Sequence, residues 1–232
     1  GQSSKRRMRR FSATLSKCDF VFAGNDYLKK SAAKFNSLVH VVPTSVDVSR
    51  YHPIAKAHSE YVDLVWIGSS STRRYLELVL PALELAAQKN PAIRLKIIAD
   101  FTLTSKYITV VSVAWSLEGE VEALQSSHVG IAPMVDDAWT RGKCALKVLQ
   151  YMAAGLPVIS SPCGVNCEVV KSGENGEFAE STDEWVEAVV KLASSQEERD
   201  RLGSRGRLMC EQEFDQEVCF KKLLRPIEIA VG

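Results

Sequence analysis

Two lysines stand four residues apart in the segment from Gly142 to Pro157, and their spacing predicts a site for an anion. Lys143 and Lys147 fall on one face of a helix at this spacing. A helix start also leaves backbone N–H groups unpaired and carries partial positive charge, so it attracts anions. Like charges at this distance repel unless an anion or an acidic side chain lies between them. A solvated basic face is the other interpretation, and the spacing alone leaves both open.

A second loop carries groups that suit the same anion. Gly68 is followed by Ser69, two further serines and Thr72, so this loop offers four hydroxyl groups and the N–H groups of the next helix start. Arg73 and Arg74 come next. Two such helix starts at one edge of a sheet would hold a diphosphate between them. The hydroxyl cluster by itself is weak evidence, because serine and threonine cap most helices for structural reasons.

Alternating strands and helices are expected to bring the two loops together. Apolar runs predict strands at 62–67, 95–98, 109–113, 129–132 and 158–159, and helices at 73–88, 117–124, 182–193, 196–213 and 219–224. Nearly continuous apolar strands separated by helices are typical of a parallel sheet covered on both faces. Such sheets bind ligands at the carboxyl ends of their strands. The sequence therefore predicts an α/β, Rossmann-like fold with its site at that edge.

The segment with the lysines is expected to be a helix that opens from a polar loop. Leu146, Leu149 and Met152 repeat at helical spacing, and Gly155 with Pro157 ends the helix. Residues 136–142 are polar and are expected to form the loop before it.

The first part of the chain is expected to be a separate, smaller unit. Strands are predicted at 18–23 and 38–42, with a helix at 27–35 whose cap is Asn25 or Asp26. The irregular, polar stretch at 44–53 is interpreted as a linker. We therefore expect two parts, a remnant of an amino-terminal domain with its linker at 1–53 and a Rossmann-like domain at 54–232.

Composition excludes several classes of protein. The chain has 232 residues, and its 29 Lys and Arg nearly balance 28 Asp and Glu, so no global field indicates nucleic acid. No apolar run approaches the roughly 20 residues that cross a bilayer. There is no secretory signal, and the first residue is Gly1, so we expect a chain that was processed, tagged or cut from a longer one.

Scattered cysteines and a short basic run have simple interpretations. The six cysteines form no disulfide or zinc pattern, so reduced cytoplasmic thiols are expected. A solvated helix face is the expected role of the basic run, with a membrane or nucleic-acid contact as the alternative. This run consists of Lys5, Arg6, Arg7, Arg9 and Arg10.

Residues 134–177 resemble the carboxyl-terminal, donor-binding half of the retaining glycosyltransferases of family 4, which have the GT-B fold. The family pattern is a Glu, seven residues, a second Glu, then Ala-Met-Ala, Gly and Pro-Val-Ile. Other family segments are similar as well, in the same order along most of the chain. The similar segments are LQYMAAGLPVI at 149–159, GVNCEVV at 164–170, GENGEF at 173–178, GIAP at 130–133 and LVHVVPTSVD at 38–47.

The chain departs from the family pattern at both glutamates. Gln150 stands at the second Glu, which the resemblance assigns to the donor ribose, and Gly142 stands at the first. Gln150 can still form a hydrogen bond with a hydroxyl group, but as a neutral amide. In the first loop Ser69 takes the place of an Arg and Arg74 that of a Lys. A subgroup with its own donor loop and a degenerate site both fit these departures.

The resemblance implies transfer of a sugar from a nucleotide-diphosphate sugar, with retention of the anomeric configuration. Lys147, Arg74, Ser69 and the N–H groups near 142–145 would stabilise the charge of the departing diphosphate. No metal and no cofactor other than this donor substrate are expected. Asp136 and Asp137 are interpreted as solvent-facing rather than as metal ligands.

The resemblance also places Gly164, Val165 and Asn166 near the sugar. Glu168 either binds a donor hydroxyl or occupies the first turn of a helix, where acids are favoured. The catalytic residues stay unassigned, because a complete enzyme of this kind has an amino-terminal domain across the cleft. We therefore expect a donor-binding half without turnover by itself.

Two further hypotheses are open. A non-catalytic nucleotide-sugar-binding or interaction module of the same fold is favoured by Gln150 and opposed by the added lysines. A dehydrogenase is disfavoured, because Gly68 does not begin a Gly-x-Gly-x-x-Gly motif. We expect a nucleotide-sugar donor as partner, a glycan, lipid or small-molecule acceptor, and no nucleic acid. The expected location is the cytoplasm, with peripheral contact at the inner face of the membrane through the absent domain as an open alternative.

Overall fold

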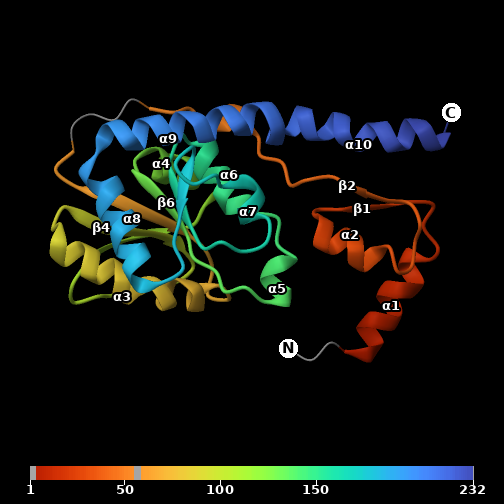
Figure 1. Ribbon diagram of the computed structural model, residues 1–232, viewed down its shortest axis with the longest axis horizontal. Helices are drawn as coiled ribbons and strands as arrows, with labels where there is room; N and C mark the ends of the chain where they lie inside the picture. Colours follow the sequence, from red (N-terminus) through yellow and green to blue (C-terminus); the bar gives the residue numbers. More distant parts are fainter. Residues whose placement is uncertain (1–3, 55–58, 232) are drawn as a thin grey trace.

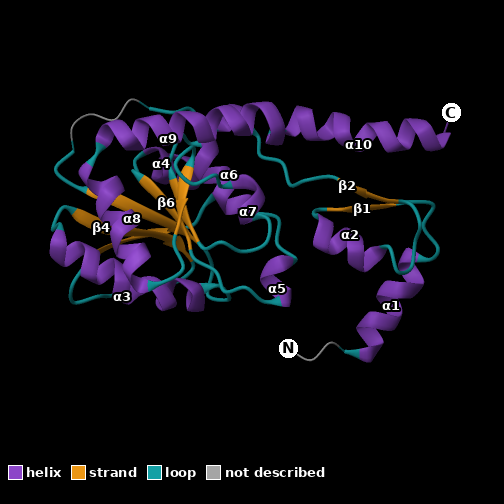
Figure 2. Ribbon diagram, viewed as in Figure 1, coloured by secondary structure: helices purple, strands orange, loops and turns teal. Residues whose placement is uncertain are grey.

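A six-stranded sheet forms the centre of the larger part of the chain (Figures 1 and 2). The structure is a computed structural model and describes residues 4–54 and 59–231. The strand order is β5-β4-β3-β6-β7-β8, and all neighbours are parallel. The strands are β3 (Val62–Ile67), β4 (Ile93–Ala99), β5 (Thr109–Ala114), β6 (Val129–Ala132), β7 (Val158–Ser160) and β8 (Gly176–Phe178). The predicted α/β fold with a parallel, Rossmann-like sheet is confirmed.

Helices cover both faces of the sheet. Alternate residues of a strand point to opposite faces, so β3 sends Leu64 to one hydrophobic core and Val65 to the other. The first core is completed by α3 (Arg73–Lys89) and α8 (Thr182–Ser194). The second is completed by α4 (Leu117–Gln125) and α6 (Leu146–Ala153). Burial on both faces explains why the strands are almost wholly apolar.

The chain reverses its direction across the sheet between β3 and β6. From β3 it runs outward to β4 and β5, returns to β6 on the other side of β3, and continues outward to β7 and β8. In open parallel sheets this reversal leaves a crevice at the carboxyl ends of the two central strands. The loops after Ile67 and after Ala132 therefore border the expected ligand site.

Asp63 is a buried carboxylate within β3. Arg94 and Lys96 of the neighbouring β4 form ion pairs with it, at 2.7 Å and 3.1 Å. Both Asp63 and Lys96 are buried. Although burial alone would raise the pKa of Asp63, the two cations lower it below its usual value. Arg94 and Lys96 therefore compensate the charge of Asp63, which would otherwise be buried at a high cost in free energy.

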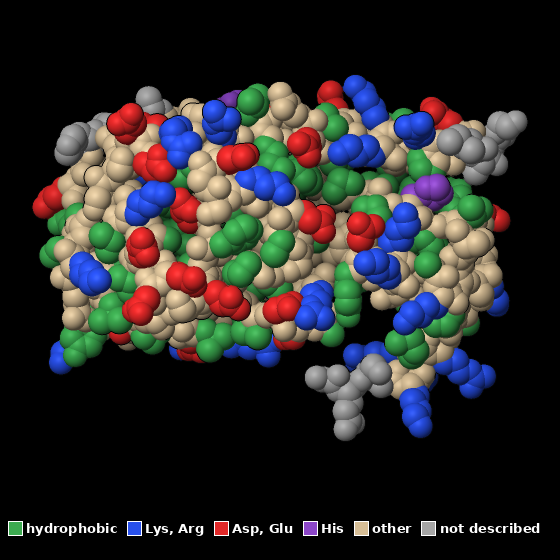
Figure 3. All heavy atoms as spheres, viewed as in Figure 1, with side chains coloured by type: hydrophobic (Ala, Val, Ile, Leu, Met, Phe, Trp, Pro, Cys, Tyr) green, Lys and Arg blue, Asp and Glu red, His purple; other side chains and the backbone are tan. Residues whose placement is uncertain are grey.

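The first part of the chain forms a small unit of its own, at the right of Figure 1. It contains α1 (Lys5–Leu15), β1 (Val21–Ala23), α2 (Asp26–Ala32) and β2 (Val39–Val41), with β1 and β2 paired in parallel. The Asn25 side chain caps α2 by accepting the N–H of Leu28, as the sequence indicated. In Figure 3, Lys and Arg side chains gather over the exposed α1. The division into domains at residue 53 stays a prediction.

Three helical elements close the chain. They are α9 (Gln196–Met209), the π-helical turn η2 (Cys210–Phe214) and α10 (Gln216–Val231), which runs out beyond the sheet toward the small unit in Figure 1. The 3-10 turn η1 (Val48–Arg50) follows the point where the linker crosses them. There Val46 forms a β-bridge with Asp215, and the N–H of Val46 donates to the carbonyl oxygen of Phe214 at 2.9 Å. None of the described helices is both long and apolar enough to span a bilayer.

Several short elements differ from the expectation. The polar stretch at 136–142 contains a one-turn helix, α5 (Ala138–Arg141). Helix α6 begins only at Leu146, so Lys147 lies in the helix whereas Lys143 lies in the loop before it, and the expectation that both lysines share one helix face is wrong. Strand β8 was not predicted, whereas the one-turn helix α7 (Asn166–Val169) has Glu168 in its first turn, which was one of the two roles expected for this residue. The helix expected at 219–224 is part of the longer α10, and the one expected at 196–213 ends at Met209. Pro226 lies inside α10.

Candidate functional site

A cavity of about 320 Å³ lies where the sheet reverses, against the carboxyl ends of β3 and β6. One wall comes from β3 and the start of α3, a second from the end of β6, and a third from the start of α6. The lining residues are Trp66, Thr72, Tyr75, Ala132, Pro133, Met134, Lys143, Cys144, Ala145, Leu146, Lys147, Val148 and Asn166. Because ligands of doubly wound sheets bind at this point, the cavity is the candidate site.

The start of α6 presents unpaired backbone N–H groups to this cavity. No side chain caps the helix. Within the described part of the chain, the N–H groups of residues 144–148 donate to no protein acceptor. Ala145 has φ 55° and ψ 21°, a left-handed conformation that is costly for a residue with a Cβ. The chain thus holds a strained turn that leaves several donors free for an anion.

Two lysines lie over aromatic rings beside these donors. Lys147 Nζ is 4.8 Å from the centre of the Trp66 ring, and Lys143 Nζ is 5.1 Å from that of Tyr75. Such distances allow cation–π attraction, which holds each ammonium group in place. The arrangement excludes a freely solvated basic face for Lys147, whose side chain is largely buried.

Burial changes the titration of both lysines. It lowers the pKa of Lys147 to about 8, with a smaller contribution from the charge of Lys143. Burial also lowers the pKa of Lys143, and the nearby charge of Arg74 adds to this effect. An anion placed between these cations would reverse both effects by offsetting their mutual repulsion. The electrostatics therefore favour a negatively charged ligand.

Arg74 extends the same basic wall. Its guanidinium carbon lies 4.7 Å from the centre of the Tyr75 ring, and Nη2 donates to the Tyr75 hydroxyl at 2.6 Å. The side chain is otherwise exposed. Tyr75 thus positions two of the predicted cations, Arg74 and Lys143.

The loop after β3 is more occupied than its sequence suggests. A Cβ on Gly68 would lie 1.8 Å from the Trp66 ring, so this glycine makes room for the indole. The Ser69 hydroxyl is 2.8 Å from that of Ser71. Ser70 gives its N–H and hydroxyl to the carboxylate of Asp100, at 2.7 Å and 2.9 Å. Part of this helix start is therefore satisfied within the protein.

Gln150 lies one turn beyond Lys147, in contact with a buried carboxylate. Its Nε2 donates to Glu120 Oε1 at 2.6 Å and to the Tyr51 hydroxyl at 3.3 Å. Tyr51 in turn donates to Glu120 Oε1 at 3.1 Å, and Trp115 Nε1 donates to Oε2 at 2.7 Å. Glu120 is only 5% exposed.

A second cavity, of about 330 Å³, separates some predicted residues from the first. It lies between the small unit and the larger domain, and Gly164, Val165 and Glu168 line it. The side chain of Glu168 is exposed. Asn166 instead faces the first cavity, where its Nδ2 donates to the Ser160 hydroxyl at 2.8 Å. The predicted sugar-side residues are thus divided between two neighbouring cavities.

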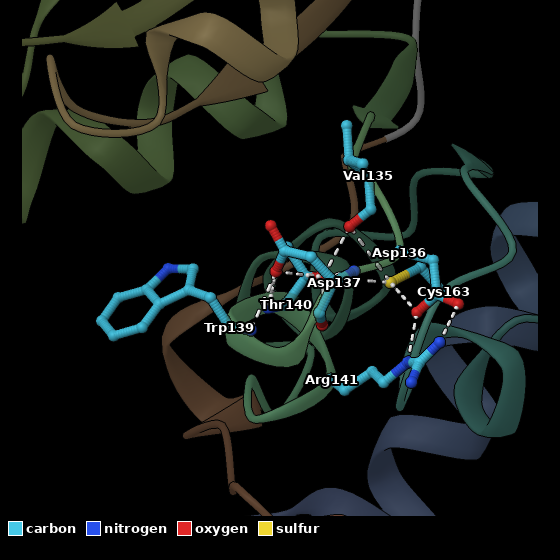
Figure 4. A network of polar contacts seen from close by, with 7 residues as sticks. All are labelled: Val135, Asp136, Asp137, Trp139, Thr140, Arg141 and Cys163. Carbon is cyan, nitrogen blue, oxygen red and sulfur yellow. Dashed lines mark hydrogen bonds and ion pairs between the residues drawn. The ribbon is translucent and has the colours of Figure 1, made fainter. Parts of the chain in front are cut away.

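A polar network at α5 forms the boundary of the second cavity (Figure 4). Arg141 forms two hydrogen bonds with the carboxylate of Asp136, both at 2.7 Å, and these hold the pKa of Asp136 below its usual value. Asp137 caps α5 by accepting the N–H groups of Trp139 and Thr140. The adjacent carboxylates therefore serve structural roles here, and no group of three metal-ligating side chains occurs in the described residues.

The small unit holds the loop that leads into α6. Asn25 Nδ2 donates to the carbonyl oxygens of Arg141 and Lys143, at 3.1 Å and 3.0 Å. Gly142 lies in this loop as the C-cap of α5 and does not line the first cavity. Asn25 thus links the small unit to the turn that carries Lys143 and Ala145.

The structure brings Lys143, Lys147 and Asn166 to one cavity. Gly68, Ser69, Arg74 and Gln150 are not among its lining residues, although Gly68 lies against Trp66 and Arg74 against Tyr75, which do line it. Trp66 and Tyr75, whose rings hold the lysines, and the Glu120 cluster were not predicted from the sequence. The apolar pattern places Trp66 in a strand and Tyr75 in a helix, and neither pattern indicates a ligand site. In the sequence, the only sign that Glu120 is buried is its place between Gly119 and Val121 in an amphipathic helix.

A doubly wound parallel sheet with an anion-favouring cavity at its reversal point defines an α/β domain of the Rossmann-like class. The family of glycosyl transferases group 1 matches residues 61–195, which is more than half of the chain. The chain therefore belongs to this family.

One curated protein is similar to part of this chain. Spore coat protein SA of Bacillus subtilis (strain 168) is 39% identical over 82 residues, which cover 34% of this chain and 22% of that protein. The match thus spans about a fifth of the curated relative.

Solved structures show the same fold at low sequence identity. HepE of Anabaena, in complex with UDP and glucose, has a TM-score of 0.76 at 11% identity, over 97% of this chain and 67% of that one. Sucrose-phosphate synthase of Thermosynechococcus elongatus has a TM-score of 0.73 at 16% identity, over 99% and 63%. The carboxyl-terminal domain of LpcC of Francisella tularensis has a TM-score of 0.59 at 15% identity, over 74% of this chain and 99% of that domain. The fold is that of GT-B glycosyltransferases.

Proposed function

We propose that this chain is the donor-binding part of a glycosyltransferase that moves a sugar from a nucleotide-diphosphate sugar to an acceptor. The observation that carries the proposal is the cavity at the sheet reversal, where free N–H groups of α6 lie beside Lys143 and Lys147. This combination fits a diphosphate better than it fits a neutral ligand. Retention of the anomeric configuration is part of the proposal and rests on the family resemblance.

The chemistry of the transfer sets what this part must do. When the bond between sugar and diphosphate breaks, negative charge grows on the leaving phosphate oxygens. Fixed donors stabilise such charge most strongly where water is excluded. Lys147 is partly buried and held over Trp66, and the α6 N–H groups are fixed by the backbone, so neither group needs to reorganise. The nucleotide sugar is the donor substrate, and the proposal includes no further cofactor.

Uridine diphosphate is the first nucleotide to test. Structures that share the fold were determined with UDP or UDP-glucose, among them HepE of Anabaena. The identity of these proteins with this chain is too low to transfer the base, so guanosine and adenosine diphosphates belong in the same titration.

A non-catalytic nucleotide-binding module is the second candidate. It is favoured by the lining of the cavity, which contains no Asp or Glu among the described residues. It is also favoured by Gln150, a neutral side chain where the family resemblance expects a carboxylate. Both candidates require the same anion site, and they differ in whether sugar is transferred.

The test is a calorimetric titration of the chain with the three nucleoside diphosphates. We expect one of them to bind, and Lys147→Met to weaken that binding by about tenfold or more, because a charge-assisted contact is lost. Met keeps the length and the apolar stem of Lys147, so packing on Trp66 is retained. Lys171→Met is the matched control, because Lys171 is exposed and outside both cavities.

Absence of binding by all three diphosphates would refute the proposal. Equal affinity in Lys147→Met and wild type would refute the placement of the diphosphate. If the diphosphate binds at this site but the protein joined to a complete amino-terminal domain neither transfers nor hydrolyses the sugar, the module would be the correct candidate.

A further inference from the structure

Glu120 is a buried carboxylate that has no cationic partner among the described residues. Three neutral donors surround it: Gln150 Nε2 and the Tyr51 hydroxyl at Oε1, and Trp115 Nε1 at Oε2. Burying a charge without a counter-charge is costly even when hydrogen bonds satisfy it. The family resemblance and the proposed diphosphate site assign no role to this group.

The carboxylate dictates how the Gln150 amide is turned. Nε2 faces Glu120 Oε1 at 2.6 Å, and an amide flipped by half a turn would place two acceptor oxygens at that distance. Nε2 also donates to Tyr51, so both of its hydrogens are used within the protein. Because Tyr51 gives its own hydrogen to Glu120, it cannot donate to the oxygen that a flipped amide would present. Only one orientation of Gln150 satisfies the cluster.

This orientation leaves the oxygen of Gln150 available. Gln150 Oε1 accepts no hydrogen bond from any described residue, and no buried side-chain oxygen or nitrogen in this set lacks a partner. Oε1 is therefore open to solvent. Gln150 lies one helical turn, about 5.4 Å along the axis, beyond Lys147 and Leu146, both of which line the cavity. Gln150 is not among the residues that line the cavity, and its oxygen is an unused acceptor one turn farther along α6.

We propose that Glu120 is a positioning residue that holds Gln150 as a hydrogen-bond acceptor for a ribose hydroxyl of the donor nucleotide. The inference rests on the proposed function and deepens it. With the diphosphate at the start of α6, the ribose is the next group along the nucleotide, and one turn of helix spans that step. A hydroxyl can give its hydrogen to Gln150 Oε1 only while Glu120 keeps the amide nitrogen turned away. The buried negative charge thus acts through the amide.

The chain offers a variant that reverses the amide. In Glu120→Gln the new amide must turn its oxygen toward Trp115, because an indole N–H is a donor only. Its nitrogen then faces position 150, so Gln150 turns its own oxygen inward and presents its nitrogen to the ligand. In the wild type the ligand group that faces position 150 must donate a hydrogen bond, whereas in this variant a ligand group that only accepts is tolerated there.

The exchange variant restores the original polarity. In Glu120→Gln/Gln150→Glu the new amide nitrogen donates to the new carboxylate, and Trp115 still finds an oxygen. Position 150 again presents an acceptor. Gln150→Glu alone places two carboxylates at the 2.6 Å contact, and we expect it to lower both nucleotide affinity and thermal stability.

The experiment compares the nucleoside diphosphate selected in the first titration with its 2′-fluoro and 3′-fluoro analogues, which accept but cannot donate. For the wild type we expect at least one analogue to bind about tenfold more weakly. For Glu120→Gln we expect the affinities for the parent diphosphate and the analogue to differ by no more than about twofold, and for the exchange variant their ratio returns to about tenfold. Glu122→Gln, an exposed change on the same helix, keeps the wild-type ratio. Circular dichroism and thermal unfolding establish that each variant is folded.

Each result decides between named alternatives. If folded Glu120→Gln keeps the wild-type ratio of affinities for parent and analogue, Glu120 is a purely structural group and the inference is overturned. An exchange variant whose ratio is no higher than that of Glu120→Gln would overturn it as well. Equal binding of parent and both analogues by the wild type would also overturn it, with the proposed function intact. Failure of every diphosphate to bind the wild type would instead refute the proposed function. Gln150→Glu that fails to fold leaves the other three comparisons decisive.

Discussion

Lys147 combines two properties that are usually separate, a charge and a largely buried position. Its depressed pKa, about 8, means that it is cationic at neutral pH but loses its proton in mildly alkaline solution. The energetic cost of keeping it charged is offset when an anion binds beside it. This lysine therefore links ligand binding to proton binding.

The pH dependence of binding follows from this link. We expect diphosphate affinity to be highest below pH 8 and to fall as pH rises through about 8, with proton uptake on binding near that pH. The uptake is measured from calorimetric heats in buffers of different ionisation enthalpy. Lys147→Met should remove it. Proton uptake unchanged in this variant would assign the effect to another group.

Folding stability should show the opposite trend. The unfolded chain holds the Lys147 proton up to about 10.5, whereas the folded chain releases it near 8. Between these values the unfolded state binds more protons, so the contribution of Lys147 to the free energy of unfolding increases with pH. Denaturant titrations of wild type and Lys147→Met at pH 7 and pH 9.5 measure it. A difference between the two proteins that does not change with pH would contradict the assignment.

Ala145 is the strained residue of the site. At φ 55° a glycine is free of the Cβ clash, so we expect Ala145→Gly to be neutral or to raise the free energy of unfolding by up to about 1 kcal/mol. Ala87→Gly, in the last turn of α3, should lower it by about 1 kcal/mol. Denaturant unfolding compares the two. A loss at position 145 as large as that at 87 would show that the left-handed turn is not formed.

At the scale of elements, the pattern of apolar residues carried most of the information. The strands β3, β4, β6 and β7 were predicted because their residues are buried on both faces, which produces continuous apolar runs, and the partly exposed edge strand β5 was predicted from its valines. Strand β8 (Gly176–Phe178) and helix α5 (Ala138–Arg141) were not, because each is short and its residues are largely polar. Helix α6 starts only at Leu146 because Ala145 adopts a left-handed conformation, which cannot continue a right-handed helix.

The ion pair inside β3 and β4 gives a prediction at this scale. Asp63→Asn leaves Lys96 buried without its charge partner, so we expect the free energy of unfolding to fall by about 3–5 kcal/mol. Denaturant unfolding measures the loss. The double variant Asp63→Asn/Lys96→Met should recover much of it. If the single variant were as stable as the double one, the pair would contribute nothing to the sheet.

Contacts across the whole molecule were beyond the reach of sequence patterns. Residues distant in the chain form the Trp66–Lys147, Tyr75–Lys143 and Glu120–Gln150 pairs, and periodicity reports only on neighbours along one element. The general place of the site was predictable, because sheet topology fixes which loops meet. Its aromatic walls and its second cavity depend on packing.

Arg207 connects the last helices to the linker. Its Nη1 donates to the carbonyl oxygens of Val48, Tyr51 and Ala153, which join the linker to the end of α6. We expect Arg207→Lys to lose most of these bonds, because an ammonium group lacks the planar fork of a guanidinium. Hydrogen exchange of residues 46–51 should then be faster, whereas that of β3 should not change. Unchanged protection of the linker would show that Arg207 is not what holds it.

The central claim is that a nucleoside diphosphate occupies the start of α6. A crystal structure of the chain with the diphosphate selected by titration tests this directly. The account predicts phosphate oxygens within hydrogen-bonding distance of the N–H groups of residues 144–147 and of Lys147 Nζ, in the cavity beside Trp66. A diphosphate bound instead in the cavity beside Asp136 and Arg141, or away from both cavities, would contradict it.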